Sequence, residues 1–566
     1  MLLISQSVLW LALQTMCGSR LTFDEYYSLS LASWILPLLL ASVLWFAFGA
    51  VPAVILLVIM VLALLFITKR EAASSSKSVF LLLPVLFGLF VLLRLAFVSK
   101  AIIPLYFDSA QHYLTIKNLL GGFDAAATSS AWPTPSYYHI GFHLLAGWIT
   151  SVLRADIIPI MLIVGQMIVV TIPFSVFFVA KHETQSNSAG LFAMLLAGFG
   201  WYMPAYTVNW GKYPALTSLP LIAFALSLGY LFLRYKSVLS PGRSAGLFTL
   251  LFASVIVTGF VHSRSLIVFG IILLTWLLVL GWYRLPRLLH VILFFAVLLG
   301  ILWEINVIQT KDVLGPLFDP YWNRGVFITS VVLFLSIFAQ RAYPRLTFAS
   351  ILAVFFLLGA MFIPITVPGY GDLTLLDRPF VEMILYLPLS FLGGLGLAGL
   401  EQALQPLSAK WQVVRWGMGG VFLGLLVVNA LLNYTLYPSD CCNIVSRDDL
   451  VAIDWVNEHL PSEARILISS TELRVLASDS FQGSVNGDAG AWITPLTDRA
   501  TVPLPYHTDF SQHTVLNTVC QLQADYIYIG GNGTAFNNDQ IEPFPNWYKI
   551  LLSMPETKVY QVIGCE

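Results

Sequence analysis

Charged residues are scarce in this chain. Asp, Glu, Lys and Arg make up 10% of the 566 residues, whereas a soluble domain carries about a quarter. Hydrophobic residues make up 58%, and the mean hydropathy is +0.81. This composition excludes a wholly soluble protein and predicts an integral membrane protein. The net charge is −1 and no basic patch stands out, so we expect no nucleic-acid partner.

Cysteines are also few. Five are present, which is too few for a disulfide scaffold. Cys442, Cys520 and Cys565 lie in the polar C-terminal part, where one bridge is expected if that part lies in an oxidising compartment. Reduced, buried cysteines are an equally good interpretation. The N-terminus has no basic segment before its apolar run, so we expect no cleaved signal peptide.

Long apolar runs fill most of the remaining sequence. A bilayer span needs about 20 apolar residues, and roughly 13 runs meet or approach that length. They are 31–48, 51–68, 79–99, 157–180, 187–203, 213–235, 245–261, 264–282, 290–308, 325–341, 346–367, 379–399 and 413–436. Residues 2–17 form a further span or an interfacial helix. We therefore predict a polytopic α-helical protein with about 13 to 14 spans.

The loops predict its orientation. The short loops "KREAASSSK", "RYKSVLSPGR", "WYRLPR" and "QRAYPR" are basic and fall on one side if the spans alternate. The positive-inside rule makes that side cytoplasmic. The longer segments then face outward from the plasma membrane: a large first outer loop at about 100–156, and residues 441–566 beyond the membrane domain 1–440.

Residues 441–566 have the pattern of a soluble α/β domain. "SRDDLVAIDWVNEHL" has helical apolar spacing with acids in its first turn, and "ARILISS" is typical of a buried strand. We predict a helix at "TELRVLAS", another at "TVLNTVCQLQ" and a strand at "DYIYIG". The chain has no P-loop or GxGxxG fingerprint, so nucleotide binding has no support.

The first outer loop contains the stretch "LYFDSAQHYLTIKNLLGGF". Asp108 with Gln111 predicts a helix cap, and the double glycine at 121–122 predicts the helix end. His112 lies one turn after Asp108 and so shares its face. Later in the loop, "YYHIGFH" places His139 and His143 four residues apart on an expected helix. One carboxylate with three histidines predicts an acid–base centre, or a divalent metal site with Asp108, His112, His139 and His143 as candidate ligands.

Other ionisable residues gather where spans meet the outer face. They are Arg94, Lys212, His262, Arg264, Glu304, Arg378 and Glu382. Charged side chains at span ends often have no role beyond extending their charge into water. Here, however, the charged residues are biased toward the outer face, which runs against the positive-inside trend. A transporter would place such charges near the midplane, whereas an enzyme acting on a lipid headgroup needs them at one interface.

The motifs "FDSAQHY", "YYHIGFH", "NWGKYP" and "GDLTLLDRPF", together with the many spans and the C-terminal domain, resemble the GT-C superfamily. These are membrane glycosyltransferases that use polyprenyl-phosphate donors, and the resemblance is to uncharacterised prokaryotic members. The chain departs from several branches of the superfamily: Asp108 is followed by Ser instead of a second acid, and a WWD-type motif is missing.

The resemblance implies inverting transfer of a hexosyl or pentosyl group to a glycan, lipid or protein acceptor. Asp108 would be the base, with His112 beside it, and Arg378 would hold the lipid phosphate. The other expected substrate-binding residues are His139, His143, Lys212, Arg264, Tyr138 and Asp488. For Asp488, in "NGDAGAW", an Asx-type turn is the more ordinary role.

Three other functions stay open at this point. A polymerase or ligase of lipid-linked glycans would share the same face and the same donor. A transporter or flippase of lipid-linked glycans would need a polar path across the bilayer. A non-catalytic scaffold would use its C-terminal domain to bind a partner.

Overall fold

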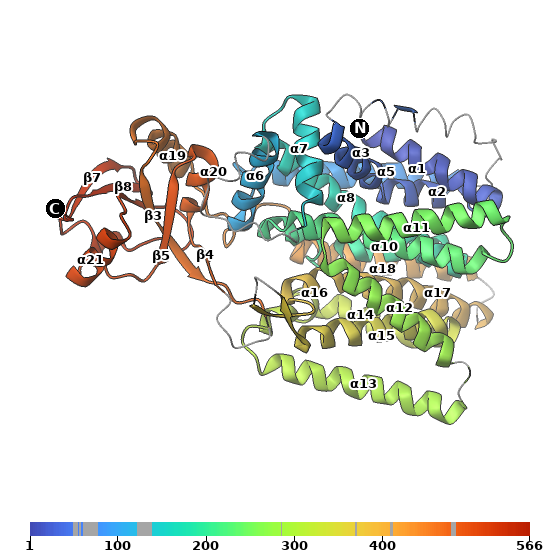
Figure 1. The fold of residues 1–566 in the computed structure, drawn as a ribbon. Helices are drawn as coiled ribbons and strands as arrows, with labels where there is room; N and C mark the ends of the chain where they lie inside the picture. Colours follow the sequence, from blue (N-terminus) through green and yellow to red (C-terminus); the bar gives the residue numbers. More distant parts are fainter. Residues whose placement is uncertain are drawn as a thin grey trace.

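A helical membrane part is joined to a C-terminal α/β domain (Figure 1). The computed structural model describes residues 1–48, 55, 58–59, 77–121, 139–282, 284, 286–367, 371–407, 411–476 and 483–565. The domain lies at one end of the helix bundle, which we call the domain end. The opposite end, where α10 meets α11, is the far end.

The membrane part is built from long helices that run between these two ends. They are α1 (Leu2–Cys17), α2 (Phe23–Ala32), α3 (Ile35–Phe48), α5 (Lys77–Val98), α8 (Ile157–Thr184), α9 (Asn187–Phe199), α10 (Tyr213–Tyr235), α11 (Pro241–Val261), α12 (Arg264–Trp282), α13 (Arg287–Gln309), α14 (Val326–Ala342), α15 (Pro344–Gly359), α17 (Tyr386–Leu404) and α18 (Trp411–Asn433). Three further helices lie at the domain end: α6 (Tyr106–Gly121), α7 (Gly141–Leu153) and α16 (Arg378–Ile384).

The prediction of a polytopic helical membrane protein is confirmed. Within the described residues, nine helices are long and apolar enough to cross a bilayer. A bent pair, Gly315–Asn323 with α14, adds a tenth if it counts as one span, and four further apolar helices are shorter. Residues 2–20 are among the nine, so the N-terminal run has the length and composition of a span. The predicted run 51–68 lies almost wholly outside the described residues.

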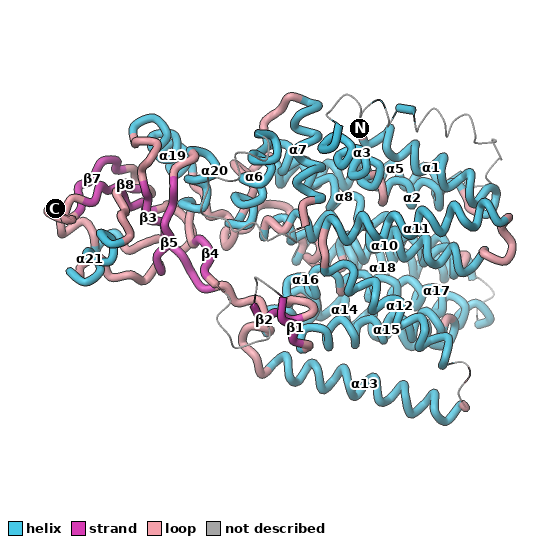
Figure 2. The backbone as a smooth tube through the Cα atoms, in the orientation of Figure 1, coloured by secondary structure: helices cyan, strands magenta, loops and turns pink. Residues whose placement is uncertain are grey.

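Two predicted spans have different bounds in the structure. The run 187–203 yields α9, a helix of 13 residues, because the chain breaks at Gly200 and turns toward the short helix η3 (Ala205–Trp210). The run 346–367 is helical only as far as Phe362, in α15 and η6 (Ala360–Phe362). Its last residues form β1 (Pro364–Val367), which pairs antiparallel with β2 (Gly371–Thr374) at the domain end (Figure 2).

Helix α17 is buried within the bundle: all residues from Tyr386 to Gly399 except Leu389 are buried. Its glycines allow neighbouring helices to come close. A methyl group on Gly394 would lie 2.8 Å from the Cβ of Ala193 on α9, and one on Gly396 would lie 2.6 Å from the Cβ of Leu335 on α14. Small residues permit such approaches between membrane helices, where packing provides much of the association energy.

The C-terminal domain holds a mixed six-stranded sheet. Its strands are β3 (Arg465–Glu472), β4 (Ser484–Asn486), β5 (Ala500–Pro505), β6 (Tyr526–Ile529), β7 (Tyr548–Ser553) and β8 (Lys558–Val562). Strand β3 pairs parallel with β5 and β6 and antiparallel with β4. The domain's helices are α19 (Arg447–His459), α20 (Ile493–Thr497) and α21 (His513–Gln521).

These elements confirm most of the predicted domain pattern. Ser446 and Asp449 form a capping box at the start of α19, and α21 and β6 lie where a helix and a strand were predicted. The predicted helix at "TELRVLAS" is wrong over its described residues. Thr471 and Glu472 continue β3 to pair with β4, and residues 473–476 are not helical.

Helix α6 joins the membrane part to the C-terminal domain. Tyr113 meets Trp492 edge to face, with ring centroids 5.7 Å apart, and the Lys117 ammonium lies 2.7 Å from the Asp498 carboxylate. Ala110 is fully buried in the hydrophobic core of the domain. The helix that carries Asp108 is thus held by the soluble domain on one face and by the membrane helices on the other.

Candidate functional site

Asp108 lies in the first turn of α6, and its carboxylate forms an ion pair with Lys212. The Lys212 Nζ is 2.9 Å from Asp108 Oδ2. The helix begins at Tyr106, two residues earlier than predicted, so Asp108 belongs to the first turn and is not the cap. An acidic side chain in this position still interacts favourably with the helix N-terminus.

Gly211 brings Lys212 to this carboxylate. It ends η3 in a left-handed conformation with φ 61°, which glycine adopts without strain. A methyl group there would collide with Ser109 Oγ and lie 2.8 Å from the Leu105 carbonyl oxygen. The motif "NWGKYP" therefore lets the η3–α10 junction lie directly on the start of α6, with the lysine next in sequence reaching Asp108.

A second ion pair joins the start of α12 to the start of α16. Arg264 Nη1 lies within hydrogen-bonding distance of Asp377 Oδ2, and Asp377 also caps α16 by accepting from the Phe380 N–H at 3.0 Å. The next residue, Arg378, has its Nε 3.9 Å from Glu382 Oε2. The predicted residues Arg264 and Arg378 are thus brought together at the domain end, through Asp377, which the sequence did not single out.

The two ion pairs belong to one electrostatic cluster. Burial opposes the charge of Lys212, but the carboxylates of Asp108 and Asp377 outweigh it and raise the lysine's pKa. Burial first, and then the charge of Asp108, raise the pKa of the Tyr106 phenol, while Arg378 lowers it. We call Asp108, Lys212, Arg264, Asp377 and Arg378 the domain-end cluster.

The histidines form two pairs beside this cluster. His112 Nδ1 lies 2.9 Å from His143 Nε2, and His139 meets His262 with ring centroids 4.6 Å apart. Burial lowers the pKa of His143 to about 3 and that of His139 to about 4, and it lowers the pKa of His112 as well. All three rings are therefore neutral at physiological pH.

The predicted helical spacing of His139 and His143 is wrong. Helix α7 begins at Gly141 and Ile140 is its N-cap, so only His143 lies on the helix. Gly141 is pressed against the end of α11, where a methyl group would lie 2.8 Å from the Val261 side chain. This contact turns His139 toward His262 while His143 faces His112.

The four candidate metal ligands do not meet in one group, although His112 and His143 contact each other. In the part of the chain that is described, no group of three or more His, Cys, Asp or Glu side chains is arranged to hold a metal ion. Asp108 pairs with an ammonium group, His112 with His143, and His139 with His262.

Two predicted site residues, Tyr138 and Asp488, remain. Tyr138 lies outside the described residues. Asp488 is fully buried in the C-terminal domain, where it caps a short helix by accepting from the Gly490 N–H and also accepts from the Gly530 N–H, both at 2.9 Å. Burial raises its pKa to about 7, against these hydrogen bonds. Both carboxylate oxygens of Asp488 are thus occupied by backbone hydrogen bonds within the domain, which agrees with the structural role of an Asx-type turn.

A hollow of about 450 Å³ opens where α6 faces the start of α8. Tyr113, Asp156 and Pro159 are among its lining residues, and the Tyr113 ring also contacts Trp492 of the C-terminal domain.

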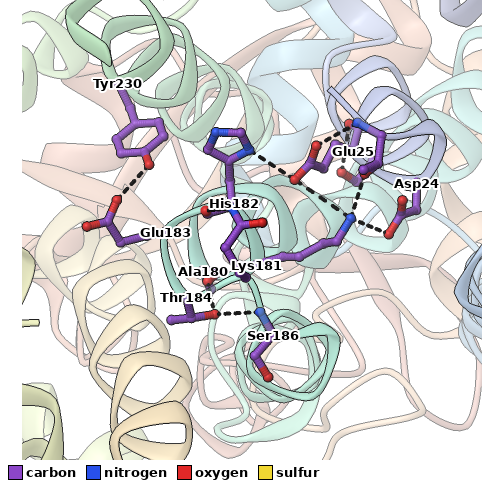
Figure 3. A network of polar contacts seen from close by, with 12 residues as sticks. Asp24, Glu25, Ala180, Lys181, His182, Glu183, Thr184, Ser186 and Tyr230 are labelled. Carbon is purple, nitrogen blue, oxygen red and sulfur yellow. Dashed lines mark hydrogen bonds and ion pairs between the residues drawn. The ribbon is translucent and has the colours of Figure 1, made fainter. Parts of the chain in front are cut away.

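A buried ionic network at the far end was not predicted (Figure 3). Lys181 Nζ lies 2.6 Å from Asp24 Oδ2 and 3.7 Å from Glu25 Oε1. His182 joins Glu25 at 3.0 Å and the Tyr235 hydroxyl at 2.9 Å. We call these five residues the far-end network. Its one sequence signal is the capping box that Thr22 and Glu25 form at the start of α2.

Comparisons with known proteins find a distant likeness to a solved structure. No family model matches the chain, and no curated protein matches it. The cryo-EM structure of the arabinofuranosyltransferase AftD from Mycobacteria is similar at a TM-score of 0.37 and 13% identity. The match covers 87% of this chain and 40% of that enzyme, so this chain spans less than half of its length. A likeness at this level is too distant to transfer a fold or an activity.

Proposed function

We propose that this protein is a membrane glycosyltransferase that moves a sugar from a polyprenyl phosphate to an acceptor at the outer face of the plasma membrane. One observation carries the proposal: a carboxylate and three cations, from four segments far apart in sequence, meet at one end of the helix bundle. These residues are Asp108, Lys212, Arg264 and Arg378.

The cations suit the phosphate of the donor. Arginine binds phosphate through paired N–H donors, and Arg264 and Arg378 both begin helices at the domain end. Their side chains, and that of Lys212, are between 16% and 26% exposed, so a ligand can reach them. Arg378 is the proposed clamp, with Lys212 and Arg264 sharing the charge of the leaving phosphate.

Asp108 suits the role of base. The acceptor hydroxyl gives its proton to the Asp108 carboxylate, and the hydroxyl oxygen attacks the anomeric carbon of the donor sugar. The bond between that carbon and the phosphate oxygen breaks, and the configuration at the carbon is inverted. In the structure Lys212 binds Asp108 Oδ2. A donor phosphate would draw the Lys212 ammonium toward itself and so free Asp108 Oδ2. Donor binding would in this way make the base available.

Two observations support an outward-facing site. The basic loops between α10 and α11, α12 and α13, and α14 and α15 lie at the end opposite the domain, and basic loops are typical of the cytoplasmic side. The C-terminal domain contains a disulfide between Cys520 and Cys565, and disulfides persist mainly in oxidising compartments.

The test is sugar transfer by the purified protein in proteoliposomes, with polyprenyl-phosphate monosaccharides as donors. We expect Asp108→Asn to lower the turnover by about 10²- to 10⁴-fold, the usual contribution of a general base. Asp454→Asn is the matched control, because Asp454 is exposed on α19 and has no part in the proposed chemistry. If Asp108→Asn retained full transfer activity, Asp108 would not be the general base. Transfer only from lipid-linked oligosaccharides would identify a polymerase or ligase instead.

A further inference from the structure

Two consecutive cysteines lie in the connection between the membrane part and the C-terminal domain. Cys441 and Cys442 follow α18, which ends at Asn433, and precede α19, whose N-cap is Ser446. Their Sγ atoms are 2.7 Å apart. Cys441 is exposed and Cys442 is buried. The Cys441 sulfur is therefore accessible to reagents, and the Cys442 sulfur is adjacent to it but covered.

Polar groups surround the exposed sulfur. The Tyr206 hydroxyl lies 3.0 Å from Cys441 Sγ and 3.9 Å from Cys442 Sγ, and Ser439 Oγ lies 3.4 Å from Cys441 Sγ. Hydrogen bonds from Cys442, Ser439 and Tyr206 lower the pKa of Cys441. Donors of this kind favour the thiolate, which is the nucleophilic form of cysteine.

We propose that Cys441 and Cys442 are a reversible redox pair that closes to a vicinal disulfide by exchange with an external disulfide. The Cys441 thiolate attacks one sulfur of the external disulfide, forms a mixed disulfide and expels a thiolate. Cys442 loses its proton to solvent and attacks the Cys441 sulfur, which expels the second thiolate. The two cysteines lose two electrons and the external disulfide gains them.

The position of the pair suits a switch better than a structural bridge. Consecutive Cα atoms are about 3.8 Å apart, which is below the usual range of about 4.4 to 6.8 Å for bridged cysteines. A disulfide outside that range is strained and more easily reduced. Cys520 and Cys565, with Cα atoms 5.5 Å apart, fall inside the range and provide the permanent bridge of the same domain.

The pair is also connected to α6. The Cys442 carbonyl oxygen accepts a hydrogen bond from the Tyr106 N–H at 2.9 Å, and Tyr106 begins α6 with a φ of 69°. The Tyr206 hydroxyl that contacts both sulfurs belongs to η3, the short helix that leads to Lys212. Closing the ring would therefore alter a backbone contact at the start of α6, which carries Asp108, and a side-chain contact on η3, which precedes Lys212.

The experiment uses the full-length protein in detergent micelles and does not depend on its enzymatic activity. The protein is treated with oxidised glutathione, and its remaining thiols are then blocked with N-ethylmaleimide. After digestion, the mass of the peptide that contains both cysteines is measured by mass spectrometry. We expect that peptide to lack both glutathione and maleimide and to be lighter by two hydrogen atoms. Mild reduction should restore two reactive thiols, which phenylarsine oxide then captures together, while Cys520–Cys565 stays closed. A peptide that carries two maleimides, or two glutathiones, would overturn the proposal.

Single variants separate the two steps. Cys442→Ser should retain one glutathione on Cys441, because the resolving thiol is gone, whereas the wild-type chain should release it. Cys17→Ser is the control, since Cys17 is buried in α1, and it should behave as wild type. Equal release of glutathione from Cys442→Ser and from wild type would show that the neighbouring thiol has no part in resolution.

Discussion

The two ends of the helix bundle each hold an ionic cluster, and water reaches them to different extents. At the domain end, Asp108 and Lys212 are 22% and 26% exposed. At the far end, Lys181, Asp24 and Glu25 are 10%, 1% and 4% exposed. Both clusters pair an acidic side chain with a lysine, so their accessibility distinguishes a place where a ligand can bind from a place where the charges only bind one another.

The energetics differ accordingly. A buried ion pair gains little net stability, but removal of one partner leaves a charge without compensation and costs several kcal/mol. Partly exposed pairs are screened and contribute about 0 to 1 kcal/mol. The far-end network is therefore expected to govern folding, and the domain-end cluster to govern function.

The largest effect on stability is expected from Lys181→Met. The change leaves Asp24 and Glu25 buried without their cation and should lower the free energy of unfolding by about 3 to 5 kcal/mol. Thermal unfolding in detergent micelles measures it, with Lys236→Met as the control because Lys236 is exposed just after α10. Lys212→Met at the domain end should cost less, because Asp108 is 22% exposed and water can solvate its charge. Equal losses for Lys181→Met and Lys212→Met would show that burial does not distinguish the two ionic clusters.

A function-specific effect is expected from Arg378→Lys. Lysine keeps the charge but loses the paired N–H donors, so the KM for the polyprenyl-phosphate donor should rise roughly tenfold, the equivalent of one charge-assisted hydrogen bond. The unfolding midpoint should stay that of wild type. Arg474→Lys is the matched control, since Arg474 is exposed beside Val475, whose carbonyl oxygen accepts from the Arg378 N–H. An unchanged KM would rule out Arg378 as the clamp.

A smaller effect follows from the buried histidines at the domain end. Burial lowers the pKa of His143 from its ordinary 6.5 to about 3. Between these values the unfolded chain binds a proton that the folded chain does not, so stability is complete above pH 6.5 and is lost as the pH falls. The loss is at most about 1.4 kcal/mol per pH unit for one such group.

Unfolding midpoints at pH 7 and pH 5 measure this dependence. The midpoint should fall on acidification, and it should fall less in His143→Gln. His507→Gln, a change at an exposed loop position, should keep the wild-type pH dependence. If His143→Gln and His507→Gln respond to pH in the same way, burial of the His112–His143 pair does not contribute to the acid sensitivity.

The smallest effect is expected at the contact between α6 and the C-terminal domain. Lys117 and Asp498 are 32% and 74% exposed, so Asp498→Asn should change the free energy of unfolding by less than about 0.5 kcal/mol. Denaturant unfolding of the full-length protein measures the change. A loss comparable to that of Lys181→Met would mean that exposure is a poor guide to the role of charges in this molecule.

Local patterns determined a large part of the fold. The helix that ends at Gly121, the capped helix after Ser446, the strand at 465–472, helix α21 and strand β6 all follow from caps, glycines and apolar spacing. These signals act over a few residues, so a sequence displays them directly. The error at 471–476 arose because pairing of β3 with β4 overrides the helical preference of "TELRVLAS".

The sequence also supplied the functional candidates Asp108, Lys212, Arg264 and Arg378, because charges at span ends are visible without a structure. It could not show that Lys212 pairs with Asp108, that Arg264 reaches Arg378 through Asp377, or which cysteines are bridged. Those contacts join residues about 100 positions apart, or choose among several cysteines. Only the packing of distant helices against one another decides them, because no local pattern records which helix ends meet.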